Sequence, residues 1–148
     1  MRRLLAAIVL SVAPVAAIPP AAAHDADEAH VLTILASPEP QTQLMALILT
    51  QAAIASGAEA RVLLCGPAAD LALQDPPEAA RTPLEPRGMS PQGLLVRLKE
   101  AGVPVAVCAI YLPNLGVGPE VLFEGIGVAT PPEVTGYMLS PGVRLLTF

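Results

Sequence analysis

The sequence predicts a single α/β domain built on a five-stranded, mostly parallel open sheet with helices on both faces. Two observations carry this prediction. Short aliphatic runs rich in β-branched residues alternate along the chain with longer segments that have recognisable helix boundaries. The first strand, helix and second strand also follow one another within about 35 residues, the length of a βαβ unit with a right-handed crossover.

The amino-terminal segment 1–23 has the three parts of an export signal. Arg2 and Arg3 supply positive charge, a mostly apolar run follows them, and small residues ending at Ala23 precede the expected cleavage point. The apolar run is shorter than the roughly 20 residues that a membrane-spanning helix needs, and Pro14 interrupts it. We therefore expect cleavage after Ala23, export to the periplasm and no membrane span in the mature chain.

After cleavage, the chain is expected to have two parts. Residues 24–29 are acidic and have no hydrophobic periodicity, so they predict a flexible lead-in. Residues 30–148 are enough for one domain with a real core and leave little room for a second.

Each element is predicted from its composition and its boundary residues. Helix boundaries come from Gly57, from Ser90 followed by proline, from Gly102, and from the capping-box pattern that begins at Thr130. Strands are expected at 30–36, 60–65, 103–112, 126–129 and 143–148, and helices at 41–56, 68–73, 91–100, 118–123 and 134–139. This succession predicts a doubly wound, three-layer sheet of flavodoxin-like order, in which the second and third strands flank the first.

Two segments suggest interactions beyond the fold. Apolar residues cover most of the circumference of the first helix, around 44–49, which indicates a helix buried on two sides and so a subunit interface. The Pro- and Ala-rich segment 66–89 is expected to be mostly mobile, and loops of this length in a small domain are usually functional or disordered.

The charge balance limits the classes of partner. The full chain has a formal charge of −5, and removal of the signal takes two arginines and no acidic residue. The mature chain is therefore more acidic still and has no basic cluster, which makes nucleic acids and anionic membrane surfaces poor partners.

In a parallel open sheet, ligands bind beyond the carboxyl ends of the strands. The predicted elements deliver three segments to that edge, at 37–43, 65–70 and 108–118, so both cysteines, Cys65 and Cys108, lie there. A packing role for these cysteines remains open, because cysteine is among the most buried residue types.

Several common chemistries are disfavoured at this edge. Prolines and Glu39 follow the first strand where a flavin or nucleotide phosphate would need bare backbone amides. The two histidines, His24 and His30, lie at the opposite end from the edge, which argues against a Ser-His-Asp hydrolase. We see no cluster of metal ligands and expect no cofactor.

The segment 98–116, LKEAGVPVAVCAIYLPNLG, resembles the signature of the DsrE-like sulfur-relay family, in which a helix, glycine and strand lead to the active cysteine. Further similarity comes from the first strand with its Ala/Leu-rich helix, from the sequence before the second strand, and from the short last strand. The resemblance covers nearly all of the mature chain. It implies a homo-oligomer, commonly a trimer or hexamer, in which Cys108 accepts sulfane sulfur as a persulfide and passes it on. The partner that this implies, besides the protein itself, is a sulfur-donor or acceptor protein.

The resemblance gives no role to Cys65, which could act as a resolving thiol. Two features depart from the family: the export signal, and the absence of a nearby cation in sequence that would lower the pKa of Cys108. Tyr111 and Asn114 lie close enough in sequence to line a pocket at Cys108, although each also fits a structural role.

A disulfide between Cys65 and Cys108 is a competing interpretation. It would stabilise the fold by about 4 kcal/mol in the chain-entropy model. With the second and third strands on either side of the first, the two residues would lie roughly 10 Å apart, and a bond would form only in the loops beyond the strand ends.

Two functional hypotheses therefore stand. The first is a sulfur-relay protein that works through a persulfide on Cys108. The second is a non-catalytic oligomeric binding module with structural or disulfide-bonded cysteines, which would use the sheet edge and segment 66–89 to hold its ligand.

Overall fold

The computed structural model describes residues 29–148, so the predicted signal peptide and almost all of the predicted lead-in lie outside the described residues. Five parallel strands form one sheet in the order β4-β3-β2-β1-β5. The strands are β1 (His30–Leu35), β2 (Glu59–Leu64), β3 (Val105–Cys108), β4 (Gly127–Ala129) and β5 (Val143–Thr147). The predicted α/β class with a parallel five-stranded sheet is confirmed.

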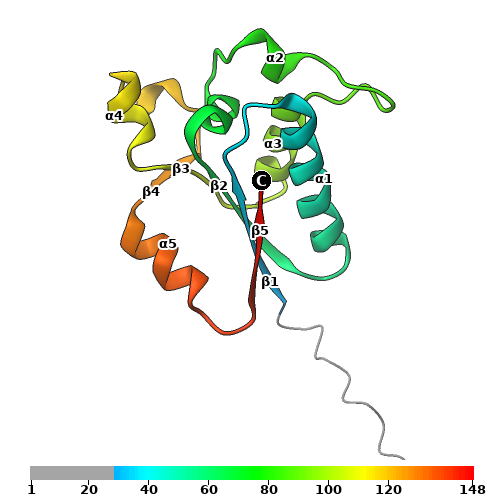
Figure 1. Cartoon of the computed structure of the whole chain (residues 1–148), viewed down its shortest axis with the longest axis vertical. Helices are drawn as coiled ribbons and strands as arrows, with labels where there is room; N and C mark the ends of the chain where they lie inside the picture. Colours follow the sequence, from blue (N-terminus) through cyan, green and yellow to red (C-terminus); the bar gives the residue numbers. More distant parts are fainter. Residues whose placement is uncertain (1–28) are drawn as a thin grey trace, which may run out of the picture.

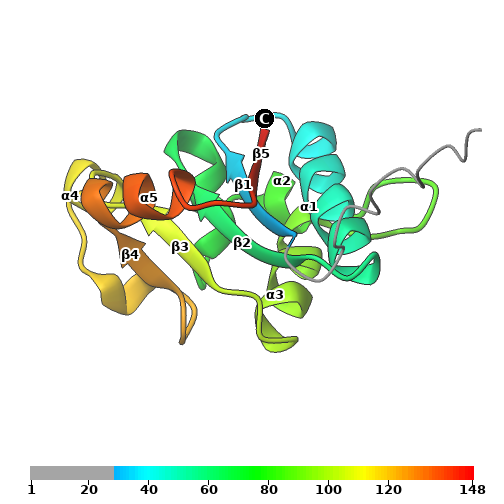
Figure 2. The same cartoon turned by 90° about the horizontal axis from the view of Figure 1, so that it is seen from below.

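The helices cover the two faces of this sheet unequally (Figures 1 and 2). α1 (Pro40–Ala55) and α3 (Pro91–Glu100) pack together on one face, and α5 (Pro131–Met138) lies on the other. The remaining helical segments are η2 (Gly66–Ala72), α2 (Glu78–Arg81), α4 (Tyr111–Leu115) and η3 (Pro119–Val121). Within residues 29–148, no helix combines the length and the apolar character that a membrane crossing requires.

The predicted strand order is wrong. β2 lies beside β1, β3 beside β2 and β4 beside β3, and only β5 returns to the far side of β1. Three successive right-handed crossovers step in the same direction, which places α1 and α3 on one face, whereas the long return from β4 to β5 carries α5 across the other. The first strand is therefore not flanked by β2 and β3.

The main core lies between the sheet and the α1/α3 layer. Leu35, Val62 and Val107 contribute to it from the strands, and Leu47 and Leu95 from the helices. One polar contact crosses this interface: the Thr33 and Thr50 hydroxyls lie 2.6 Å apart, and Thr50 also donates to the Ala46 carbonyl. The buried hydroxyls are thereby satisfied, as buried polar groups must be.

Several helix boundaries agree with the sequence. Ser90 caps α3 by accepting a hydrogen bond from the Gly93 amide at 3.1 Å. Thr130 and Glu133 form the predicted capping box of α5.

One local expectation is wrong. The third strand ends at Cys108, and residues 111–115 form the short helix α4 instead of continuing the strand.

Segment 66–89 contributes packed structure. Its first part is η2, at the position of the helix predicted over 68–73, and the remainder contains α2, in which Ala80 is buried, and a β-bridge between Leu84 and Met89.

Candidate functional site: a disulfide at the carboxyl edge of the sheet

The register between β2 and β3 brings the two cysteines together. Leu63 pairs with Ala106 and Leu64 with Val107, a constant separation of 43 residues along the chain. Cys65 continues in the extended conformation beyond β2, so the same register sets it opposite Cys108 at the end of β3. The Cα atoms lie 5.2 Å apart, and the two cysteines form a disulfide.

This pairing answers the question that the sequence left open. The expected separation of roughly 10 Å assumed that β1 lies between the two strands, whereas β2 and β3 are hydrogen-bonded neighbours. The bond therefore needs no excursion into the loops. Within the part of the chain that the structure describes, no cysteine is free.

The disulfide lies at the carboxyl edge, where parallel sheets usually bind ligands. The Cys65 amide donates to the Leu35 carbonyl, and the amide of Ala109 donates to the Ala129 carbonyl, so both sides of the pair are tied to neighbouring strands. Both cysteines are only partly buried, and Ile110, two residues after Cys108, is 70% exposed.

A second, non-covalent tie joins the same two segments. Asp70 follows Cys65 in η2, and Tyr111 follows Cys108 at the start of α4. The Tyr111 hydroxyl donates to Asp70 Oδ1 at 2.7 Å. Burial raises the pKa of Tyr111 well above its usual value, and the hydrogen bond and negative charge of Asp70 raise it further. The phenol therefore stays protonated and holds the contact at neutral pH.

The other predicted edge residues have local structural partners. Asn114 donates from its side chain to the Ile110 carbonyl at 2.6 Å, so it stabilises α4. In the segment after β1, Gln43 donates to the Ser37 carbonyl at 2.8 Å. Of the two residues considered as neighbours of Cys108, Tyr111 thus forms a long-range contact and Asn114 does not.

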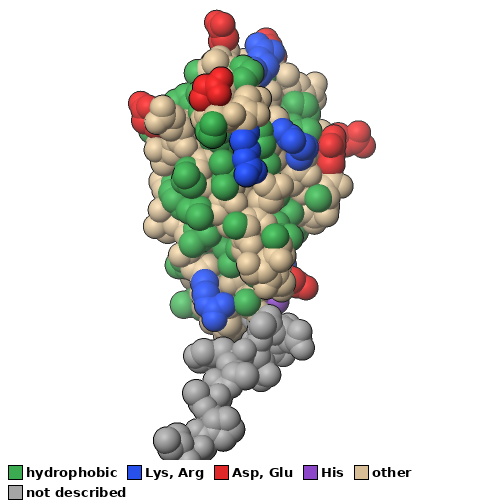
Figure 3. All heavy atoms as spheres, turned by 90° about the vertical axis from the view of Figure 1, so that its right-hand side faces the viewer, with side chains coloured by type: hydrophobic (Ala, Val, Ile, Leu, Met, Phe, Trp, Pro, Cys, Tyr) green, Lys and Arg blue, Asp and Glu red, His purple; other side chains and the backbone are tan. Residues whose placement is uncertain are grey.

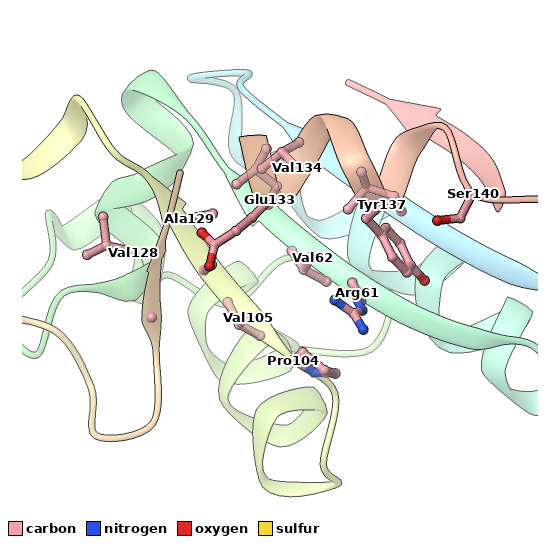
Figure 4. Close-up of a pocket in the computed structure, with 14 residues that line it drawn as sticks. Arg61, Val62, Pro104, Val105, Val128, Ala129, Glu133, Val134, Tyr137 and Ser140 are labelled. Carbon is pink, nitrogen blue, oxygen red and sulfur yellow. The ribbon is translucent and has the colours of Figure 1, made fainter. Parts of the chain in front are cut away.

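The opposite face of the sheet carries a cavity that the sequence analysis missed (Figure 4). Its volume is about 550 Å³, and it lies between the sheet and α5. Arg61, Leu63 and Ala106 line it from the strands, and Glu133 and Tyr137 line it from α5. Alternation along β2 was a usable signal, because Arg61, Leu63 and Cys65 fall on one face of a strand.

These features define a parallel α/β protein with a strand order of 4-3-2-1-5 and a cystine at its carboxyl edge. The chain matches no protein-family model, and no curated protein matches it in sequence.

Solved structures with a similar fold include the following two. The YchN protein from E. coli is 22% identical with a TM-score of 0.63, and the match covers 82% of this chain and 99% of that protein. A protein of unknown function from Methanobacterium thermoautotrophicum, MTH1491, is 14% identical with a TM-score of 0.62, over 81% of this chain and 99% of that one. At these identities the likeness shows a shared fold.

The raised pKa of Tyr111 predicts a stability difference that depends on pH. Tyr111→Phe removes the hydrogen bond and should lower the free energy of unfolding by about 1 kcal/mol at pH 7. As the pH rises above about 10, the unfolded phenol ionises while the folded one keeps its proton, so wild type loses this advantage. Urea unfolding of both proteins between pH 7 and pH 11 measures the difference between their free energies of unfolding.

Tyr137→Phe is the matched control, because the Tyr137 hydroxyl makes no hydrogen bond to any described residue. Its stability should follow that of wild type across the same range. If the difference in free energy of unfolding between wild type and Tyr111→Phe stays constant up to pH 11, the assigned contact is contradicted.

Proposed function

We propose that the chain is an exported, DsrE-like protein of sulfur or thiol metabolism, in which Cys108 accepts sulfane sulfur as a persulfide and passes it on. Cys65 acts as the resolving thiol. The observation that carries this proposal is the direct pairing of the two cysteines across β2 and β3 at the carboxyl edge of the sheet.

The paired cysteines can run this chemistry with balanced steps. After a dithiol reductant opens the disulfide, the Cys108 thiolate attacks the outer sulfur of a donor persulfide. A bond forms to that sulfur, the donor sulfur–sulfur bond breaks, and the donor leaves as a thiolate. An acceptor thiolate can then take the outer sulfur from Cys108. Alternatively, the Cys65 thiolate attacks Cys108 Sγ, forms the disulfide and releases hydrosulfide.

The second cysteine suits an exported protein. A solitary thiol outside the cytoplasm is exposed to stepwise oxidation, which becomes irreversible at the sulfinic acid. Cys65 gives Cys108 a reversible oxidised state instead, because the two sulfurs bond to each other. Export itself is proposed from the signal pattern of residues 1–23, with cleavage after Ala23.

A persulfide-loading experiment tests the proposal. The reduced wild type, Cys65→Ser and Cys108→Ser proteins are treated with inorganic polysulfide, alkylated and measured by intact mass spectrometry. Cys65→Ser should retain one extra sulfur on Cys108, because nothing resolves the persulfide. Wild type should gain the sulfur transiently, then release hydrosulfide and return to the disulfide, and Cys108→Ser should load about tenfold less.

Equal loading of Cys65→Ser and Cys108→Ser would overturn the assignment of Cys108. The binding-module hypothesis would then lead, since the disulfide also suits a structural cross-link. Intact mass spectra of the exported protein also check the cleavage site, because the mass of the chain identifies its first residue, which is expected to be His24.

We also propose that the protein is a homo-oligomer, a trimer or hexamer. The support comes from α1: its inner side is buried, but Met45 and Leu49 on its outer side are 51% and 42% exposed. In Figure 3, hydrophobic side chains spread over the middle of the face that carries α1, and most charged ones lie toward its upper end. Exposed apolar surface of this kind marks interaction sites.

Light scattering coupled to size-exclusion chromatography tests this assembly. The double variant Met45→Glu, Leu49→Glu should shift the protein from an oligomer to a monomer, because each carboxylate would be buried without a partner. Gln51→Glu, also exposed on α1, is the control and should leave the mass unchanged. A monomeric wild type, or a double variant with the wild-type mass, would contradict the proposal.

A further inference from the structure

The cavity between α5 and the sheet extends the proposed site. Its floor is apolar, because Leu32, Leu63 and Ala106 project from the sheet face opposite the main core. Its roof is α5, none of whose residues is buried. A single eight-residue helix thus spans this face without closing onto it, which leaves an open cavity of about 550 Å³ (Figure 4).

The alternation of β2 and β3 places the disulfide on the same face of the sheet as this cavity. Arg61, Leu63 and Cys65 occupy alternate positions of one extended segment and therefore share a face. Ala106 and Cys108 do the same on β3, each directly beside its partner on β2. At roughly 3.3 Å per residue, Arg61 and Cys65 are about 13 Å apart along the strand, with the apolar floor between them.

Arg61 supplies a positive charge at the end of this strand face that lies farther from the disulfide. Its guanidinium carbon lies 4.1 Å from the centre of the Tyr137 ring, which fixes its orientation. Within the described residues, Arg61 has no ion pair, and the Glu59 carboxylate on the same face lies 3.4 Å from His30 Nδ1. The guanidinium therefore keeps its donors for a ligand, and their fork matches a carboxylate.

Glu133 gives the cavity its polarity. It lies beside Ala129, whereas Arg61 lies beside Tyr137 (Figure 4). Hydrogen bonds from the Thr130 backbone and side chain lower the pKa of Glu133, so it is ionised at neutral pH. Ala129 pairs with Cys108, which places this negative charge at the disulfide end. An anionic ligand group is thus favoured at Arg61 and disfavoured near Glu133.

We propose that the sulfur donor or acceptor is a low-molecular-weight thiol that carries a carboxylate, bound in this cavity. The carboxylate pairs with Arg61, the carbon chain lies over Leu63 and Ala106, and the sulfur reaches Cys108. As a donor, the bound persulfide gives its outer sulfur to the Cys108 thiolate and leaves as a thiolate. This inference rests on the proposed persulfide chemistry and names the substrate class of the same site.

The test compares two donors on a Cys65→Ser background, which holds the persulfide on Cys108. Glutathione persulfide carries carboxylates, and the persulfide of 2-mercaptoethanol carries none. Loading of reduced protein, followed by intact mass, should be about tenfold faster with the glutathione donor, the gain expected from one charged hydrogen-bonded contact. Arg61→Met should abolish this preference, so that the two donors load the protein at similar rates.

Two further variants make the result specific. Arg61→Lys keeps the charge and should retain part of the preference, whereas Arg97→Met, at an exposed position of α3, should retain all of it. Equal loading by both donors, unaffected by Arg61→Met, would overturn the substrate class and leave the persulfide chemistry standing. Loading by neither donor would instead overturn the proposed function itself.

Discussion

The hydrogen-bonded register between β2 and β3 is the constraint on which the site depends. Because parallel pairing keeps a fixed offset along two strands, the pairing of Leu64 with Val107 also determines that Cys65 meets Cys108. A slip of one residue would turn one cysteine to the other face of the sheet and separate the two sulfurs. The buried valines and leucines of the main core therefore hold the two cysteines opposite each other.

The two faces of the sheet have different physical roles. On one face, α1 and α3 exclude water from a continuous aliphatic core. On the other, α5 covers the strands loosely, and a cation, an apolar floor and a disulfide follow one another along β2. Packing is thus concentrated on one side of the sheet, which leaves the other side available for a ligand.

The sequence predicted what depends on local pattern. Strand and helix positions followed from hydrophobic runs, the cap at Ser90 and the capping box at Thr130, and the fold class followed from their alternation. The arrival of both cysteines at one edge also follows from alternation alone.

What failed depends on long-range arrangement. The direction in which each crossover steps is not encoded in any one segment, so the neighbourhood of β2 and β3, and with it the disulfide, was misjudged. Residues 109–112 are as apolar as a strand, and the turn into α4 was missed. The contact of Tyr111 with Asp70 spans 41 residues of sequence and left no local signal.

The central claim is that Cys65 and Cys108 form a reversible redox pair on a sheet that stays folded in both states. The most direct measurement is the equilibrium of the full chain with glutathione buffers of graded ratio, read by thiol alkylation alongside circular dichroism. The account predicts one reversible two-electron transition with an unchanged helical and sheet signal. A disulfide that yields to thiols only after the protein unfolds would be structural, and would contradict the account.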